Sequence, residues 1–371
     1  MPKRKYLLVF GTRPEAIKMA PVLRALELDA QAEPVVCVTG QHDGLLSSVL
    51  SLFAIEPRYN LRMMEQDQQP SRLTAKLLPE LDSILKLEKP DWVLVQGDTT
   101  SALAGAMSAC YSRTPVAHIE AGIRSHNHRE PFPEEINRKV IDVMSGLHFA
   151  PTDLDKRALI REGFCEDTIH VTGNTCVDAL RLVSAMPFSW QDSMLREVPR
   201  SNRRIILVTV HRRENHGKPL DSICQAVQIV AQRYRETAHF VIPIHPNPNV
   251  SSTIARALGG ISNVTLTAPF GYRALIALAQ ACFFAMTDSG GLQEELPVMG
   301  KPALVLRNVT DRPGAILAGA AKLVGTDRDS IISAFTALME DPVLYQQMAQ
   351  HRDLFGGGFA ADAIANILSA N

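Results

Sequence analysis

The stretch YLLVFGTRPEAIKMAPVLRAL, residues 6–26, joins an apolar run to a helical pattern through a single glycine. The run shows no polar alternation, which is typical of a strand buried on both faces of a parallel sheet. Gly11 allows a tight turn. Thr12 suits the cap of a helix, and Pro14 and Glu15 suit its first turn. The stretch therefore predicts a strand, a tight turn and a helix, the repeating unit of an α/β fold.

The same rhythm recurs along the chain, where short apolar runs end in polar clusters and longer helical stretches follow. Twelve strands are too many for one compact sheet of this kind. We therefore predict two doubly wound, Rossmann-like domains in tandem, each with a parallel sheet. The twelve runs lie at residues 6–11, 35–40, 91–98, 116–122, 146–151, 168–174, 204–211, 239–246, 263–269, 282–290, 302–307 and 321–326.

The break between the domains is predicted between Gly173 and Ser201. Residues 187–204 are polar and contain proline, and the apolar rhythm restarts at Ile205. Such a composition is typical of a connecting segment. The predicted limits are 1–172 for the N-terminal domain, 173–357 for the C-terminal domain and about 358–371 for a terminal helix.

The composition is that of a globular protein with a substantial core, since 46% of the 371 residues are hydrophobic. The 38 basic and 39 acidic residues leave a net charge of -1, so no overall field attracts nucleic acid or an anionic membrane. No apolar run reaches the roughly 18 residues of a membrane span. The six cysteines are scattered without a C-x-x-C pair, which favours free thiols in a reducing compartment. We expect a cytoplasmic protein.

Titratable and polar residues gather where the predicted strands end. In open parallel sheets, ligands bind beyond the carboxyl ends of the strands. Polar loops alone would account for some of these positions, but not for so many charged groups directly at the strand ends. We predict a single ligand cleft between the two domains. The residues concerned are Arg13, Gln41, His42, Asp98, Glu120, His211, His245, Asp288, Ser289 and Arg307.

Arg13 stands at the start of the first predicted helix, where unpaired N–H groups and the helix dipole favour an anion. Its forked guanidinium suits a phosphate. In the alternative interpretation Arg13 is solvated, and Glu15 and Lys18 form a surface pair. The segment has neither the G-x-x-x-x-G-K-[ST] nor the G-x-G-x-x-G pattern, which argues against ATP hydrolysis and NAD chemistry.

A second candidate anion site is TDSGGLQEE, residues 287–295. A predicted strand ends at Asp288, and Ser289 and two glycines lead into a helix. Two glycines permit a close approach of the backbone to a phosphate, and Glu294 or Glu295, one turn into the helix, can reach a ribose diol. The alternative is a simple tight turn.

Acidic residues follow the strands of the first half. Each of them alone would suit a helix cap or an ion pair with Arg124 or Arg138. Together, at successive strand ends, they favour proton abstraction and return. The clusters are QGDTTS with Asp98, HIEAGIRS with Glu120, and EPFPEEINRK with Glu130, Glu134 and Glu135.

The histidines lack metal-binding spacing, so we expect no metal. His118 lies inside a predicted strand and is interpreted as a core histidine. His211 closes another strand directly before two arginines, and this arrangement favours a contact with a diphosphate.

These motifs, taken in order, resemble the signatures of the non-hydrolysing UDP-N-acetylglucosamine 2-epimerases from about Leu7 to Gly325. The resemblance implies a GT-B fold, two Rossmann-like domains around a cleft with the C-terminal helix crossing back to the first domain. It also implies a homodimer that interconverts UDP-GlcNAc and UDP-ManNAc for polysaccharide biosynthesis, with no cofactor. The matching motifs are GTRPEAIKMAP, QGDTTS, HIEAGIRS, PFPEEINR, VTGN, HRREN, TDSGGLQEE and RPGA.

The resemblance carries residue roles with it. Asp98, Glu120 and Glu134 match the catalytic carboxylates of the family, and His211 matches its essential histidine. Which carboxylate removes the proton and which returns it stays open. Ser289 and the glycines would contact phosphate, Glu295 the ribose and Phe270 the uracil. The substrate-binding positions are Arg13, Lys18, Phe270, Ser289, Gly290, Gly291, Glu295 and Arg312.

Two departures from the family pattern bear on regulation and specificity. Bacterial members often bind a second UDP-GlcNAc as an activator, and Gln41, His42 and His245 are the candidate activator site here. The stretch QHDG differs from the family's QHREQ, and Gln68 stands where an arginine is expected, so we predict weak or absent activation. In TDRPGAIL, residues 310–317, small and apolar residues replace acidic ones, which implies a reshaped nucleotide loop or a modified sugar.

Three other functions stay open. A GT-B glycosyltransferase shares the fold and the UDP-sugar site but needs an acceptor. A hydrolysing relative would release free ManNAc and UDP. A non-catalytic UDP-sugar sensor would not need three carboxylates.

Overall fold

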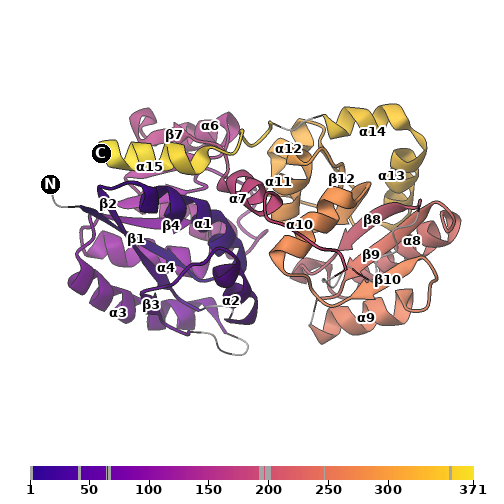
Figure 1. The fold of residues 1–371 in the computed structure, drawn as a ribbon, viewed down its shortest axis with the longest axis horizontal. Helices are drawn as coiled ribbons and strands as arrows, with labels where there is room; N and C mark the ends of the chain where they lie inside the picture. Colours follow the sequence, from indigo (N-terminus) through magenta and orange to yellow (C-terminus); the bar gives the residue numbers. More distant parts are fainter. Residues whose placement is uncertain are drawn as a thin grey trace. The chain divides into compact units, whose positions relative to one another are not determined.

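The chain forms two compact units in the computed structural model. The first unit comprises Met1–Leu182 and Phe355–Asn371, and the second comprises Val183–Leu354. Figure 1 shows the course of the chain through both. The structure describes residues 3–40, 43–63, 65, 68–191, 196, 202–245, 247–350 and 353–371.

The first unit is built on a seven-stranded parallel sheet with the order β3-β2-β1-β4-β5-β6-β7. The chain winds outward from β1 in one direction and then returns to β4 on the other side, so β1 and β4 flank the switch point at which such sheets bind ligands. The strands are β1 (Arg4–Phe10), β2 (Ala32–Val38), β3 (Tyr59–Asn60), β4 (Trp92–Gln96), β5 (Val116–Ile119), β6 (Leu147–Ala150) and β7 (Ile169–Val171).

Helices cover both faces of this sheet. The helix α1 contacts α2 and α15, whereas α4 contacts α3 and α5, which gives the three layers of a doubly wound fold. The helices are α1 (Arg13–Leu28), α2 (Asp43–Leu52), α3 (Pro70–Glu88), α4 (Thr100–Tyr111), α5 (Glu134–Met144), α6 (Asp153–Arg161), α7 (Thr175–Ser184) and α15 (Ala360–Ala370), with a short 3₁₀ turn at Glu166–Thr168.

Burial on both faces explains why the β1 sequence does not alternate, because every side chain from Tyr6 to Phe10 is at most 1% exposed. The helix α4 lies unusually close to the sheet at Gly105. A Cβ there would stand 3.0 Å from Cγ1 of Val95 and 3.2 Å from Cγ1 of Val9. This close approach explains the small residues of α4.

The second unit has a six-stranded parallel sheet with the order β10-β9-β8-β11-β12-β13. Its core includes Phe240, Phe284 and Phe335, all fully buried. The strands are β8 (Arg204–Thr209), β9 (Ala238–Pro243), β10 (Val264–Thr267), β11 (Phe284–Thr287), β12 (Ala303–Val305) and β13 (Ala321–Leu323). The helices are α8 (Lys218–Arg233), α9 (Pro248–Leu258), α10 (Tyr272–Ala281), α11 (Gly290–Val298), α12 (Pro313–Leu317), α13 (Arg328–Glu340) and α14 (Pro342–Ala349), with a 3₁₀ turn at Arg213–Asn215.

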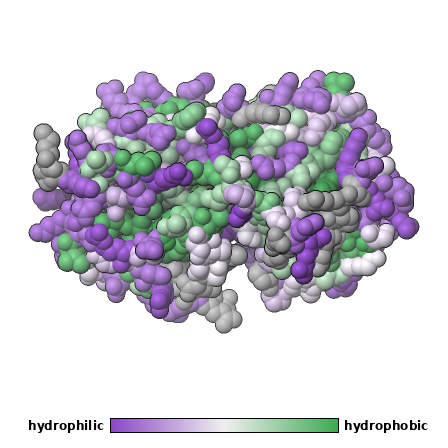
Figure 2. Space-filling model, in the orientation of Figure 1, coloured by the Kyte–Doolittle hydropathy of each residue, from purple (hydrophilic) through white to green (hydrophobic). Residues whose placement is uncertain are grey.

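The two doubly wound parallel sheets confirm the predicted fold class, and each of the twelve predicted runs overlaps a strand. The two-residue strand β3 was not predicted. Among the described residues no helix is long and apolar enough to cross a membrane. On the face drawn in Figure 2, hydrophilic residues predominate and are interspersed with smaller hydrophobic patches.

The division of the chain lies at 182/183, inside the predicted break between Gly173 and Ser201 but ten residues after the predicted domain limit at 172/173, and the terminal segment joins the first unit from Phe355 rather than from about 358. The reason is that the start of α7 is bonded to this segment. The N–H of Asn174 donates to the carbonyl of Phe355 at 2.9 Å. The carboxylate of Asp178 accepts from the N–H groups of Ala360 and Ala361 at 3.3 and 3.0 Å, which caps α15.

Candidate active site

The turn after β1 requires a glycine. A Cβ at Gly11 would stand 2.0 Å from Oγ1 of Thr39 and 2.3 Å from Oγ of Ser101. The helix α1 then begins at Arg13 with Thr12 as its N-cap, as the sequence predicted. Arg13 is half-buried at the first helical position.

The buried carboxylate of Glu15 stabilises this turn through hydrogen bonds. Its Oε2 accepts from the N–H groups of Gly11 at 3.1 Å and Thr12 at 2.8 Å, and its Oε1 accepts from the hydroxyl of Thr99 at 2.7 Å. Burial raises the pKa of Glu15 to about 7, although these hydrogen bonds oppose the shift. Glu15 therefore connects the end of β1 to the segment that follows β4.

The alternative of a surface pair between Glu15 and Lys18 is wrong, because the two residues are only 1% and 6% exposed. Lys18 instead forms a close ion pair with Glu120, which directly follows β5. The Lys18 ammonium thus brings α1 and the end of β5 together.

Glu120 lies in an unusual backbone conformation. Its φ is +70°, a region that costs a non-glycine residue about 1–3 kcal/mol and is enriched at functional sites. The carboxylate also accepts hydrogen bonds from Nε2 of Gln96 and, at 3.3 Å, from Nδ2 of Asn174. Three elements therefore hold a nearly buried carboxylate in one place.

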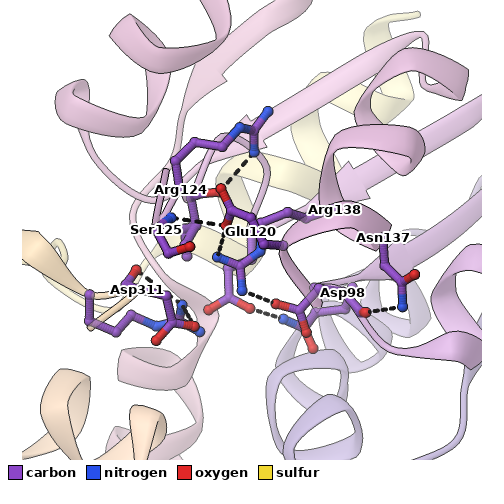
Figure 3. Close-up of polar contacts among 12 residues, drawn as sticks. Asp98, Glu120, Arg124, Ser125, Asn137, Arg138 and Asp311 are labelled. Carbon is purple, nitrogen blue, oxygen red and sulfur yellow. Dashed lines mark hydrogen bonds and ion pairs between the residues drawn. The ribbon is translucent and has the colours of Figure 1, made fainter. Parts of the chain in front are cut away.

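Asp98 follows β4 and faces α5, as Figure 3 shows. Its carboxylate forms a close ion pair with Arg138, and its backbone carbonyl accepts from Nδ2 of Asn137 at 2.9 Å. Of the two arginines considered from the sequence, Arg138 is therefore the partner of Asp98. The strands β4 and β5 are neighbours, with Gln96 paired to Ile119, so Asp98 and Glu120 follow adjacent strand ends.

The acidic cluster at the start of α5 divides into two kinds of carboxylate. Glu135 is fully buried and structural, because it accepts from the N–H groups of Ser125 at 2.9 Å and His126 at 3.1 Å and pairs with Arg138. Glu134 is the first residue of α5 and remains half-exposed. Glu134 therefore differs from Glu135 in being partly exposed.

In the second unit, Asp288 follows β11 and organises the segment after β8. Its carboxylate accepts from the N–H groups of His211 and Arg212 at 2.9 and 2.8 Å and from Nδ2 of Asn215 at 3.0 Å. Nδ1 of His211 lies 3.1 Å from the same carboxylate. Burial alone would raise the pKa of Asp288, but His211 and the backbone donors hold it below its usual value.

This contact fixes the orientation of the His211 ring. Its side chain is 39% exposed, and the ring stacks on that of His245 with centroids 6.0 Å apart. An imidazole held at Nδ1 by a buried carboxylate presents its Nε2 to a ligand. His245, considered from the sequence as part of an activator site, is therefore a neighbour of His211.

The glycines after Asp288 open the N-terminus of α11. Ser289 is the N-cap, and Gly290 and Gly291 are the first two helical residues. Apart from the chain neighbours and the backbone of α11 itself, no atom of the described residues lies within 4 Å of a Cβ built at Gly291, and at Gly290 the nearest is Nη2 of Arg212 at 3.3 Å. The helix start therefore has room for an anion near its N–H groups.

Three further predicted residues of the second unit are partly or fully buried. Glu295 accepts from the hydroxyl of Tyr272 at 2.7 Å. Arg312 forms an ion pair of 2.6 Å with the fully buried Glu294, which ties the loop before α12 to α11. Phe270 is only 3% exposed, so little of its ring is accessible in this conformation.

Some predicted features fall outside what the structure tests. Gln41 and His42 lie outside the described residues. The cleft between the two compact units stays a prediction. Within the described part of the chain, no group of three or more His, Cys, Asp or Glu residues could hold a metal ion.

The sequence did not single out several partners that organise the site. Gln96 and Asn174 lie within the quoted motifs QGDTTS and VTGN, but their convergence on Glu120 depends on the tertiary structure. Asp288 was noted as a strand-end residue, and its bond to His211 was not predicted. The buried pair of Glu294 with Arg312 was also missed, because a glutamate on a helix gives no signal of its partner.

A family model described as UDP-N-acetylglucosamine 2-epimerase matches residues 24–369. The chain belongs to the UDP-N-acetylglucosamine 2-epimerase family. This membership confirms the resemblance found in the motifs, and with it the isomerase class.

Relatives in this family match over almost their whole length. The chain is 43% identical to the UDP-N-acetylglucosamine 2-epimerase of Neisseria meningitidis serogroup A, covering 99% of this chain and 100% of the relative. It is 42% identical to that of Escherichia coli K12, covering 99% of both.

Solved structures of family members confirm the GT-B class. A crystal structure of the Neisseria meningitidis enzyme bound to UDP-GlcNAc has a TM-score of 0.93 at 42% identity and covers 99% of this chain and 100% of that one. The Methanocaldococcus jannaschii enzyme in complex with UDP-GlcNAc and UDP has a TM-score of 0.85 at 32% identity and covers both chains completely.

Proposed function

We propose that this chain interconverts UDP-GlcNAc and UDP-ManNAc by eliminating UDP to a bound 2-acetamidoglucal and adding it back with inversion at C2. The observation that carries the proposal is the pair of constrained carboxylates, Asp98 and Glu120, at adjacent strand ends in a member of this family. A cytoplasmic location and a role in polysaccharide biosynthesis, both expected from the sequence, belong to the same proposal.

The order of steps follows from the acidity of C2–H. This hydrogen is not adjacent to a carbonyl, so direct deprotonation is difficult, whereas a turnover near ~10 per second allows a barrier of only roughly 16 kcal/mol. Departure of UDP from C1 generates an oxocarbenium-like centre that acidifies C2–H. A carboxylate can then remove the proton, and UDP and a proton add back with the proton on the other face.

In this proposal Asp98, Glu120 and Glu134 are the acid and base groups. Lys18 supports the role of Glu120 by holding its carboxylate in place through their ion pair. Arg138 does the same for Asp98. Each acid or base role is worth about 10²–10⁴ in rate.

The UDP group is assigned to the second unit. Ser289, Gly290 and Gly291 would receive phosphate oxygens at the start of α11, and His211 would donate from its free ring edge. Stabilising the leaving diphosphate with one well-placed donor is worth about 3–4 kcal/mol. Arg13 and Arg312 would add positive charge, Lys18 would contact the substrate, Glu295 would bind the ribose and Phe270 would bound the uracil.

We also propose that UDP-GlcNAc is at most a weak activator. Gln68 stands where the family pattern has an arginine, and its amide donates to the backbone carbonyl of Met63. A neutral side chain used in this way supplies no charge to a second diphosphate. A strongly sigmoidal saturation curve for UDP-GlcNAc would contradict this part of the proposal.

A homodimer belongs to the proposal as well. The helix α5 exposes Ile136, Val140 and Val143 on one face, and the preceding Phe132 is 68% exposed. An exposed apolar stripe of this kind is typical of a protein contact. A second copy would bury it close to Glu134 on the same helix. Analytical ultracentrifugation of V143E against wild type tests this contact, and a monomeric wild type would refute it.

The test of the proposed reaction is proton NMR of UDP-GlcNAc with the enzyme in heavy water. An epimerase places deuterium at C2 and produces UDP-ManNAc without an acceptor. A glycosyltransferase or a sensor gives no exchange, and a hydrolysing enzyme gives free ManNAc with UDP. Absence of exchange with folded protein would refute the proposal.

The same assay tests the alternative of a modified sugar. The segment around Gly314 and Leu317 lacks the acidic residues of the family pattern, and Leu317 is 75% exposed on α12. If a modified UDP-HexNAc is the substrate, C2 exchange with plain UDP-GlcNAc will be far slower than with the modified sugar.

A further inference from the structure

His118 occupies the middle of β5 and is fully buried. Each of its ring nitrogens faces an acceptor. Nδ1 lies 2.6 Å from Oδ1 of Asp142, and Nε2 lies 2.7 Å from the backbone carbonyl of Gly97. The interpretation of His118 as a core histidine is correct in its burial, but the ring also connects α5 to the end of β4.

Asp142 is itself held in position. The guanidinium of Arg124 donates to its Oδ2 at 2.7 Å, and the same guanidinium donates to both carboxylate oxygens of Glu162 at 3.0 and 2.7 Å. Burial alone would raise the pKa of Asp142, but His118 and Arg124 keep it below its usual value. A continuous chain of side-chain contacts therefore runs from Glu162 through Arg124 and Asp142 to His118.

This series of contacts ends at the backbone carbonyl of Gly97, next to the candidate acids Asp98 and Glu120. Gly97 directly precedes Asp98 and has a φ of +70°. Its N–H donates to the carbonyl of Ile119 at 3.0 Å, and a Cβ at this position would stand 3.3 Å from Oε2 of Glu120. The Gly97 turn is thus packed between the two carboxylates, and a rotation of its peptide would move Asp98.

Stability alone is a weak reason for such a network. Burying several charged groups carries a desolvation cost that their mutual attraction often only matches, and apolar replacements of similar volume are frequently neutral. A network that ends on the carbonyl beside a reactive carboxylate has a geometric use instead, because small displacements of reacting groups lower rates steeply.

We propose that His118 is a positioning residue, held by Asp142 and Arg124, that fixes the Gly97 turn so that Asp98 and Glu120 address the same substrate carbon. This inference rests on the proposed function of the two carboxylates. His118 does not touch the substrate and acts through the Gly97 carbonyl.

The test compares His118→Gln and His118→Ala with a matched control, His148→Gln. His148 is paired with His118 in the sheet register, is 1% exposed and bonds through Nε2 to the backbone carbonyl of Asp142 at 2.9 Å. The Nε2 bond of His148 goes to the backbone of Asp142, whereas the bond to the Gly97 carbonyl comes from His118. Replacing His148 therefore disturbs the same core without releasing the turn. Thermal unfolding identifies the variants that fold.

In His118→Ala, kcat for epimerisation should fall by about a hundredfold, with KM changed by no more than about threefold, because orientation and not binding is lost. His118→Gln keeps a donor for the Gly97 carbonyl and should recover part of this loss. His148→Gln should keep kcat within about threefold of wild type.

The inference is overturned if kcat of both His118 variants equals that of wild type, or if His148→Gln lowers kcat as much as they do. If His118→Ala does not fold, His118→Gln against His148→Gln decides the question by the same criterion. C2 exchange by the wild-type enzyme is measured in the same series, so a failure of the proposed reaction itself is recognised separately.

Discussion

The two units share the order of their first six strands, and they place different residues at the ends of their central strands. In the first unit, the carboxylates of Asp98 and Glu120 are each paired with a cation, Arg138 and Lys18. In the second unit, the carboxylate of Asp288 accepts hydrogen bonds from backbone N–H groups and contacts His211. It lies just before the glycine-rich start of α11. In the proposed function, the doubly wound sheet supplies only the location, and the residues after each strand decide between acid/base chemistry and anion binding.

Replacing Asp98 in the first unit should have the largest effect, because it should lower the reaction rate without changing UDP binding. Asp98→Asn removes a proposed acid or base and keeps the hydrogen bond to Arg138. We expect kcat to fall by about 10²–10⁴, while UDP binding measured by calorimetry stays within about twofold of wild type. A large loss of UDP affinity would show that the two roles are not divided between the units as proposed.

Replacing Asp288, the strand-end carboxylate of the second unit, should have a smaller effect on activity. Asp288→Asn keeps an acceptor for the backbone donors but weakens the hold on the His211 ring. We expect kcat/KM to fall about tenfold to a hundredfold, less than when an acid or base is lost. Wild-type activity in this variant would mean that the orientation of His211 does not matter to the reaction.

Replacing Gly291, at the start of α11 in the second unit, should affect UDP binding and leave stability intact. Alanine fits at Gly291 without a clash in the free protein, and it suits a helix better than glycine. Gly291→Ala should therefore keep or raise the thermal stability, yet raise the Kd for UDP by about tenfold, which corresponds to about 1.4 kcal/mol. Unchanged affinity would place the phosphates elsewhere.

The last prediction concerns the pH dependence of stability and the buried Glu15 of the first unit. The pKa of Glu15 is raised to about 7 in the folded chain, so the folded state holds a proton that the unfolded state releases above about 4.3. Stability from this group is complete below the unfolded pKa and is lost as pH rises towards about 7, by at most about 1.4 kcal/mol per pH unit.

Glu15→Gln should remove this slope. Thermal unfolding of wild type and variant from pH 4.5 to 7.5 measures the difference, in which contributions from other groups cancel. Asp142 and Asp288, whose pKa values are lowered, lose their stabilising contribution only at more acidic pH. Parallel curves for the two proteins would show that Glu15 is ionised throughout this range.

The sequence was sufficient to predict the elements and not their contacts. Fully buried strands such as β1 are visible in the sequence because they lack alternation, and the turn at Gly11 is visible because only glycine fits it. The partner of Lys18 was missed because Glu120 lies 102 residues away in the chain, and helical spacing suggested Glu15 instead. The unit boundary was placed early because the bond from Asn174 to Phe355 joins segments far apart in sequence.

The helix α15 has a consequence for synthesis of the protein. The first unit contains residues from both ends of the chain, and the second unit is inserted between them. During translation, residues 183–354 have therefore left the ribosome before the layer formed by α15 can be added to the earlier-made sheet. Most of the first unit is therefore translated before the second unit, but the first unit is complete only once α15 has been made. Shortening α15 should impair the first unit rather than the second.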